Sequence, residues 1–467
     1  MGPVRILGVG AAAPALRLPV EAIQAAWDRK GGRGQVAVCA ADEDTLTLAW
    51  DAAIRAIRAA GVPPEAIDGL WWGTSNPPFA DGPSHAVLAN ALAVGPAGAL
   101  LSGSTHSGIE ALLAAADAVA AGSVATAVVV ASDSIRPGPG TGFETRAGAG
   151  AAAFVVAATG GTAAISARAT TSRPLLDRYR GVGELDERDL YDGRLFREEI
   201  FLPIVQSTID LISEDEPIDR WSLPDPDGRL GSVVAKRVAA AELTSTNVYA
   251  AVGDSGAAAA LLGLAGALAD SGRAVAVAYG GGRATAIRVD ATAPVAGAET
   301  TTDMLAGGRV ISYHKALRVR GHVEPGGETI PMGVPPESAL FARGAEEMLQ
   351  LLGGRCEDCG TINTPPSIHP HCVACGGPKL EPVQLARSGS VHTFVVNYTM
   401  PAPFEAPLPI AVIDLDDGAR VMLQVDDGGS ELAIGAPVEL MLRKYAHERG
   451  VPVYGYKARP VVTKGEQ

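Results

Sequence analysis

The chain has 467 residues, a formal net charge of −14 and 47% hydrophobic residues, enough for about two or three domains with large apolar cores. The acidic balance, without any basic block, argues against nucleic acid and anionic membrane surfaces as partners. The N-terminus has no signal-peptide pattern, and no apolar stretch is long enough to span a bilayer. We therefore expect a cytoplasmic protein that binds neither nucleic acid nor membranes.

Residues 1–300 alternate between Ala-rich helices and short strands rich in Val and Ile. A helix is expected over residues 44–60, because Gly61 and the two prolines beyond it form a normal helix stop. Strands are expected at residues 4–9, 69–73, 126–132, 151–158 and 163–169. This alternation indicates an α/β fold with a buried parallel or mixed sheet.

An internal repeat is the clearest sign of organisation. His106 is followed by Ser-Gly, an Ala-rich helix and a strand at 127–132, and Asp254 is followed by Ser-Gly, a similar helix and a strand at 274–279. Helix–strand units of this composition can also recur by chance. The matching Ser-Gly positions favour a duplicated fold with a pseudo-twofold axis, which would bring the two helix starts together.

Four of the five cysteines form two CxxC-Gly pairs that are twelve residues apart. Four thiolates make the closed tetrahedral site typical of structural zinc, and this is favoured over a redox pair or a disulfide. A closed site has no open position for water, so we assign it no catalytic role. The predicted ligands are Cys356, Cys359, Cys372 and Cys375. The fifth cysteine, Cys39, lies in an apolar segment and is expected to be a buried structural residue.

The last third of the chain has a different character. Residues 301–345 are expected to form a connector, with a short helix at about 337–352, and residues 346–385 a rubredoxin-like zinc ribbon. Short strands at 390–398, 408–414, 420–425 and 437–443 indicate a small β-barrel over residues 386–467. A ribbon followed directly by a barrel resembles the OB-fold domain that accompanies thiolase-like proteins. Its expected role is to complete an active site or to hold an acyl carrier.

Six short motifs occur along the first 300 residues: DEDTLT at 42–47, GTSNPP at 73–78, DRYR at 177–180, DGRLF at 192–196, PDGRL at 226–230 and YGGG at 279–282. In this order they resemble hydroxymethylglutaryl-CoA synthases, especially the archaeal kind. The resemblance implies a thiolase-like duplicated αβαβα core, with halves at residues 1–165 and 166–300. It also implies a homodimer and a substrate that is an acyl group on CoA or on the phosphopantetheine of an acyl carrier protein.

The catalytic groups of that family can be located by resemblance, and all four are changed. The cysteine that takes the acyl group at a helix start corresponds to His106, or to Thr105 if the synthase spacing is used. The general acid/base glutamate corresponds to Ser75. The family histidine corresponds to Pro224, and the asparagine of the second half corresponds to Asp254.

Two hypotheses account for these changes. In the first, His106 and Asp254 form an acid/base dyad, with Ser75 nearby, that acts on a thioester without a cysteine nucleophile. The reaction would be acyl transfer, aldol or retro-aldol chemistry, or decarboxylation in specialised metabolism, although Ser104, Thr105 or Ser107 could also be acylated. The expected substrate-binding residues are Thr105, Ser107, Tyr179, Arg180 and Asp225. In the second hypothesis, the chain is a non-catalytic scaffold or partner subunit that binds acyl thioesters. The ionisable residues at both helix starts favour the first.

Overall fold

The computed structural model describes residues 3–189, 192–212, 217–323, 338–398, 407–426, 432–448 and 451–461. The chain forms two compact units, Met1–Glu324 and Pro325–Gln467. Residues 324–337 of the expected connector lie outside the described residues, whereas residues 301–323 belong to the first unit. There they form α10 (Thr301–Leu305), β15 (Arg309–Val310) and α11 (Tyr313–Val319).

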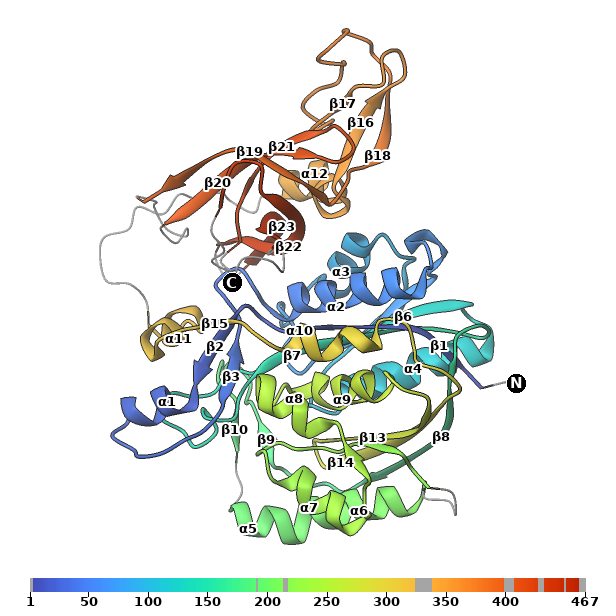
Figure 1. Ribbon diagram of the computed structural model, residues 1–467, viewed down its shortest axis with the longest axis vertical. Helices are drawn as coiled ribbons and strands as arrows, with labels where there is room; N and C mark the ends of the chain where they lie inside the picture. Colours follow the sequence, from blue (N-terminus) through green and yellow to red (C-terminus); the bar gives the residue numbers. More distant parts are fainter. Residues whose placement is uncertain are drawn as a thin grey trace. The chain divides into compact units, whose positions relative to one another are not determined.

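A ten-stranded sheet runs through the first unit (Figure 1) and consists of two halves with the same pairing pattern. One half has the order β5 (Ala97–Leu101), β4 (Gly69–Gly73), β6 (Thr126–Ser134), β7 (Ala149–Ala157), β1 (Arg5–Ala12). The other has the order β12 (Glu242–Leu243), β11 (Arg220–Ser222), β13 (Gly272–Gly280), β14 (Arg283–Ala291), β8 (Ala163–Ser172). In each half the first three strands pair in parallel, and each of the last two strands pairs antiparallel with the strand before it in this order. The pairing of β1 with β8 joins the two halves. Because the halves have the same strand order and directions, the predicted duplication is confirmed.

Helices form layers around and between the two half-sheets (Figure 1). α4 (Ser107–Ala121) and α9 (Ala259–Ala267) lie in the middle, where their apolar residues share one core with β1, β6, β7 and β13. α2 (Thr45–Ala60) and α3 (Ser84–Leu92) cover one half, and α6 (Leu202–Asp210) and α7 (Leu230–Arg237) cover the other. This arrangement is the predicted αβαβα core.

The expected helix over residues 44–60 is α2, with Asp44 as its N-cap. The Asp44 carboxylate accepts from the Leu46 and Thr47 amides, and the Thr47 hydroxyl accepts from the Asp44 amide, which is a complete capping box. Gly61 ends the helix with a left-handed φ of 64°. Sequence signals at both ends therefore set the length of this helix.

Smaller elements complete the first unit. α1 (Val20–Ala26) and α11 pack against a small sheet of β15, β2 (Leu16–Pro19) and β3 (Gln35–Val38). The hairpin β9 (Arg178–Tyr179) and β10 (Arg188–Asp189), α5 (Gly193–Leu195) and α8 (Ser245–Val252) lie in the second half. Cys39, which directly follows the end of β3, is half-buried and not buried as predicted. Within the described part of the chain, no helix has the length and apolar character needed to cross a bilayer.

The second unit begins with α12 (Ser338–Gln350) and contains two sheets. The first has the order β17 (Ile362–Asn363), β16 (Leu352–Cys356), β18 (Leu380–Gln384) and carries the cysteine pairs. The second is antiparallel, with the order β21 (Arg420–Gln424), β20 (Leu408–Leu415), β19 (Ser388–Asn397), β22 (Pro437–Glu448), β23 (Val451–Pro460). A bridge between Val425 and Ala458 nearly closes this sheet into the predicted OB-fold barrel.

Candidate functional site

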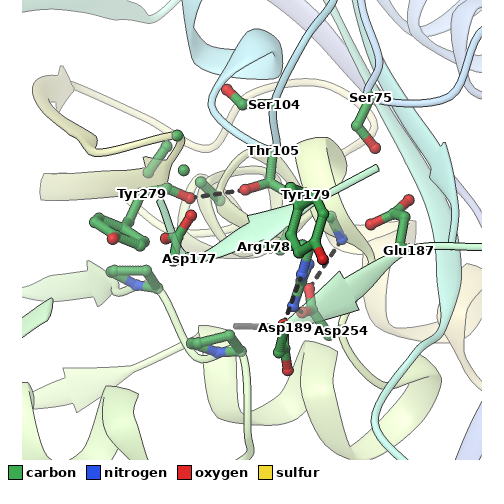
Figure 2. A pocket seen from close by; sticks show the side chains of 18 of the residues that line it. Ser75, Ser104, Thr105, Asp177, Arg178, Tyr179, Glu187, Asp189, Asp254 and Tyr279 are labelled. Atoms are coloured by element: carbon green, nitrogen blue, oxygen red, sulfur yellow. Dashed lines mark hydrogen bonds and ion pairs between the residues drawn. The ribbon is translucent and has the colours of Figure 1, made fainter. Parts of the chain in front are cut away.

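A cavity of about 230 Å³ lies where the starts of the two middle helices meet the ends of the strands (Figure 2). Ser75 lines it from just beyond β4, residues 104–105 from the turn before α4, and Asp254 from the turn before α9. The hairpin β9–β10 lines another side. Both halves of the duplicated fold therefore contribute to one site.

His106 is not among the residues that line this cavity. Its side chain is 1% exposed, with Nε2 2.8 Å from Thr285 Oγ1 and Nδ1 3.3 Å from a Glu110 carboxylate oxygen. The second contact is at ion-pair distance but is not aligned as a hydrogen bond. Because the backbone of His106 is already helical, its side chain lies along α4 towards Glu110, one turn further on. The predicted dyad with Asp254 is therefore wrong.

Thr105, the alternative for the family cysteine position, does line the cavity. Its Oγ1 donates to the main-chain oxygen of Tyr279 at 2.9 Å. Ser104 lines the cavity beside it, and its hydroxyl accepts from the His106 amide at 3.2 Å. Ser107 is fully buried, its hydroxyl has no hydrogen-bond partner in the described part of the chain, and it is not a lining residue. At this helix start, Ser104 and Thr105 therefore line the cavity, whereas Ser107 does not.

Asp133, near the end of β6, is a site residue that the sequence analysis missed. It is fully buried and accepts four hydrogen bonds, from the Thr74 hydroxyl (2.9 Å), the Ser75 amide (2.9 Å) and hydroxyl (2.8 Å), and the Ala257 amide (2.8 Å). Burial raises the pKa of this carboxyl, and the four donors oppose that rise. Asp133 therefore holds Ser75 at the cavity wall and ties it to the start of the second-half helix.

Asp254 is bound to Arg178 (Figure 2). An Arg178 Nη donates to the Asp254 carboxylate at 2.6 Å, and the other oxygen of Asp254 accepts from the Gly256 amide at 3.0 Å. Arg178 also lies 3.8 Å from the carboxylate of Asp189, its partner in the hairpin, and 4.4 Å from the centre of the Phe143 ring. Burial disfavours the guanidinium charge, but the carboxylates, Asp254 first, outweigh burial and raise the pKa of Arg178. Arg178 is therefore a fixed positive charge at the cavity wall.

Glu187 is the second site residue that the sequence analysis missed. It is 6% exposed and lines the cavity, and no hydrogen bond to its carboxylate forms within the described residues. Burial raises its pKa to about 7; Arg178 and Arg180 oppose this rise, and Asp133 and Asp254 add to it. No local pattern marks Glu187 in the sequence, because the strand that follows it has two residues and no periodicity.

Three more of the predicted substrate-binding residues, Tyr179, Arg180 and Asp225, also line the cavity. Arg180 donates to the side-chain oxygen of Asn76 at 2.7 Å. Asp225 accepts from the Gly231 amide at 3.1 Å, and burial raises its pKa to about 6. The structure thus brings these residues together with Thr105, and their binding roles stay predictions.

A second cavity, of about 600 Å³, adjoins the first and shares Glu187, Asp189 and Phe196 with it. The basic residues that line it are Arg146, Arg188, Arg197 and Arg229. The first three contact carboxylates, whereas Arg229 forms no side-chain hydrogen bond or ion pair within the described residues. Arg229 therefore has a guanidinium available for an anionic ligand.

The four ribbon cysteines lie together as predicted, with all four sulfur atoms within 4.8 Å of one another. The sulfurs of Cys356 and Cys375 are 3.6 Å apart, and those of Cys359 and Cys372 are 3.5 Å apart. A tetrahedral zinc ion with Zn–S bonds of about 2.3 Å places its sulfurs about 3.8 Å apart, so the group fits zinc. Such an ion would stabilise the ribbon and, with four protein ligands, would leave no position for substrate.

Comparison with protein families identifies both parts of the second unit. Residues 349–381 match the ChsH2 rubredoxin-like zinc ribbon domain, and residues 382–443 match the ChsH2 C-terminal OB-fold domain. The predicted ribbon and barrel are therefore confirmed.

Individual relatives resemble different parts of the chain. A DUF35 domain-containing scaffold protein from Pyrococcus furiosus is 34% identical over 136 residues, which are 28% of this chain and 98% of that protein. A hydroxymethylglutaryl-CoA synthase from the same organism is 35% identical over 159 residues, which are 33% of this chain and 45% of that synthase. The chain thus matches less than half the length of that synthase. The crystal structure of the curacin biosynthetic pathway HMG synthase in complex with acetyl donor-ACP has a TM-score of 0.60 at 17% identity, covering 73% of this chain and 94% of that one. This likeness confirms the thiolase-like fold.

Proposed function

We propose that this chain, which belongs to the family of DUF35 domain-containing scaffold proteins and carries a hydroxymethylglutaryl-CoA synthase-like thiolase fold, is an enzyme that acts on acyl thioesters. One observation carries the proposal: a cavity at the two central helix starts is lined by ionisable side chains, and Thr105, one of the two predicted equivalents of the family cysteine, is among the lining residues. The names of two similar proteins add support. One is a hydroxymethylglutaryl-CoA synthase, and the other is an HMG synthase whose structure was determined in complex with acetyl donor-ACP.

The adjoining cavity supports a phosphate-bearing carrier for the acyl group. Its arginines can form charge-assisted, bidentate bonds to the phosphates of CoA or phosphopantetheine. Arg229, whose guanidinium has no side-chain partner within the described residues, is the best placed for this role. The acyl group would then lie in the smaller cavity beside Thr105.

The chemistry that fits this cavity has no covalent acyl-enzyme. A threonine hydroxyl needs an adjacent base to become a nucleophile, but Thr105 Oγ1 donates its proton to a main-chain oxygen. Ser104 accepts from a main-chain amide, which does not activate it either. Acid/base carbon–carbon bond chemistry on a bound thioester, such as aldol or retro-aldol reaction or decarboxylation, therefore fits better than acyl transfer through the protein.

Direct measurement with acyl thioesters tests this function. The protein is incubated with acetyl-, malonyl-, acetoacetyl- and 3-hydroxyacyl-CoA, and with the same acyl groups on carrier protein; products and the intact protein mass are followed by mass spectrometry. We expect turnover of at least one thioester without a mass increase of the protein. An acyl adduct on Ser104 or Thr105 would refute the non-covalent chemistry.

Binding provides a second test with a matched control. Arg229→Gln should weaken CoA binding about tenfold or more, because it removes one charge-assisted contact to phosphate. Arg168→Gln removes an arginine that is 50% exposed and pairs with Asp117 on the surface, and should leave binding unchanged. Equal affinities of the two variants would contradict the placement of the carrier.

A non-catalytic scaffold is the second candidate function. The naming of the Pyrococcus relative as a scaffold protein and the absence of cysteine at residues 104–107 both favour it. A scaffold would bind CoA thioesters, and lose binding with Arg229→Gln, while converting none of them. Turnover of a thioester decides between the two.

A further inference from the structure

The carboxylates that line the smaller cavity differ in how they are bound. Asp254 is held by Arg178 and a main-chain amide, Asp189 by Arg146 at 2.8 Å, and Asp225 by a main-chain amide. Asp177 and Glu187 accept no hydrogen bond within the described residues. These two acids are therefore the lining carboxylates that are free to bond to a ligand.

The two acids stand on different sides of the cavity. Figure 2 shows Asp177 beside Tyr279, and Glu187 on the opposite side, near Ser75. One Asp177 carboxylate oxygen is completely covered by protein, whereas no Glu187 oxygen is both covered and unpaired. Glu187 thus has both carboxylate oxygens open to a ligand, whereas Asp177 has one.

The backbone of Glu187 is anchored although its side chain is not. Its amide donates to the Arg136 oxygen at 2.8 Å, and the residue forms a parallel bridge with Pro137. It also lines the wall that both cavities share. Because its backbone is fixed and its carboxylate is unbonded, Glu187 puts an acid/base group at the junction of the two cavities. The phosphopantetheine of the carrier would deliver the acyl group to this junction.

Several charges surround Glu187 on the elements packed against it. Arg178 and Arg180 of the hairpin favour its ionised form, and Asp133 of β6 and Asp254 before α9 favour its protonated form. Burial is the largest influence and also favours the protonated form, so the pKa is about 7. A group that titrates near neutral pH can both take and return a proton during turnover.

We propose that Glu187 is the proton-transfer residue of this enzyme and removes a proton from the carbon next to the thioester carbonyl. The Cα–H bond breaks, an O–H bond forms on Glu187, and the electron pair moves to the carbonyl oxygen to give an enolate. The proton on Glu187 exchanges with solvent, and return of a proton from Glu187 to the carbon restores the thioester. This inference rests on the proposed thioester function and adds the residue that performs the proton transfer.

Deuterium exchange tests the step without knowledge of the second substrate. Acetyl-CoA and butyryl-CoA are incubated with the full chain in D₂O, and deuterium at the α carbon is measured by NMR; binding is measured in parallel by calorimetry. Wild type should incorporate deuterium. Glu187→Gln should bind both thioesters as wild type does but exchange about 10²–10⁴-fold more slowly. Glu187→Asp, which keeps the carboxylate, should keep part of the exchange.

A control variant separates the carboxylate from the shape of the hairpin. Glu184 lies in the same hairpin turn, where it accepts from the Gly181 amide at 3.0 Å and pairs with Arg188, and it lines neither cavity. Glu184→Gln therefore makes the same chemical change three residues away, and its exchange is compared at a saturating concentration of thioester. We expect it to exchange at the wild-type rate. Exchange by Glu187→Gln at the wild-type rate, loss of exchange in Glu184→Gln to the same extent, or binding by wild type without any exchange would overturn the role of Glu187. Failure of wild type to bind either thioester would instead overturn the proposed function, and this inference with it.

Discussion

The buried carboxylate of Asp133 allows a quantitative test, because each of its oxygens accepts one main-chain amide and one hydroxyl. Oδ1 receives the Ser75 amide and the Thr74 hydroxyl, and Oδ2 receives the Ala257 amide and the Ser75 hydroxyl. In Asp133→Asn, either orientation of the side-chain amide turns its NH₂ group towards one main-chain amide. The hydroxyls can rotate to accept, but an amide cannot. One buried N–H therefore loses its partner, at a cost of about 1–3 kcal/mol.

The pH dependence of this effect has a defined sign. Burial raises the pKa of Asp133 above its ordinary value of 3.8, so the folded state binds the proton more tightly than the unfolded state. This contribution to stability is fully present below pH 3.8 and is lost as pH rises towards the raised pKa. Asparagine lacks this contribution. The destabilisation by Asp133→Asn relative to wild type should therefore be larger at pH 5 than at pH 8.

Tryptophan fluorescence during urea unfolding reports on the first compact unit, which contains Asp133, because all five tryptophans lie within residues 1–324. Asp117→Asn is a matched control: this side chain is 58% exposed and pairs with Arg168 on the surface, so its loss should change the free energy of unfolding by less than about 1 kcal/mol. If Asp133→Asn is no more destabilising than Asp117→Asn at pH 5, the reasoning is refuted.

Four further predictions follow from the contacts described above. Cys372→Ser should lower bound zinc, measured by mass spectrometry of the metal, from one ion per chain, whereas Cys39→Ser should not. The rate of α-deuteration should rise with pH through about 7 and then level off, because Glu187 acts as a base when ionised; a rate that falls over this range would contradict that role. Gly108→Ala should destabilise the first unit by about 1–3 kcal/mol, since its Cβ would lie 2.1 Å from a main-chain oxygen of Ala257. Gly266→Ala, with no atom within 4 Å of the added carbon, should stabilise it by about 0.5–1 kcal/mol in the same urea titration.

Local signals were sufficient for much of the fold. α2 carries its cap at Asp44 and its stop at Gly61, so its ends were predictable from neighbouring residues. The Ser-Gly repeat indicated two equivalent helix starts, and the sheet contains the corresponding two halves. The zinc ribbon was predictable for the same reason, since all four cysteines lie within twenty residues of one another.

The site was harder to predict because it depends on side-chain direction and on distant segments. The repeat placed His106 and Asp254 at equivalent positions, but the helical backbone of His106 turns its ring towards Glu110 and Thr285. Glu187 precedes a two-residue strand, which has no recognisable period. Its pKa is set by burial and by residues up to 67 positions away in the chain, such as Asp254. No pattern in the sequence alone contains that information.

The arrangement of charge around the cavity bears on the choice between an enzyme and a scaffold. Burying a carboxylate without a hydrogen bond is unfavourable, and burial raises the pKa of Glu187 to about 7 for that reason. A neutral side chain at this position would avoid the cost and give a more stable fold, so a site that only binds gains nothing from it. Proton transfer at neutral pH, in contrast, requires a group that is part protonated and part ionised. Residues 104–107 contain no cysteine that could form an acyl-enzyme at this helix start, but the buried acid at the junction of the two cavities favours proton-transfer chemistry over a purely binding role.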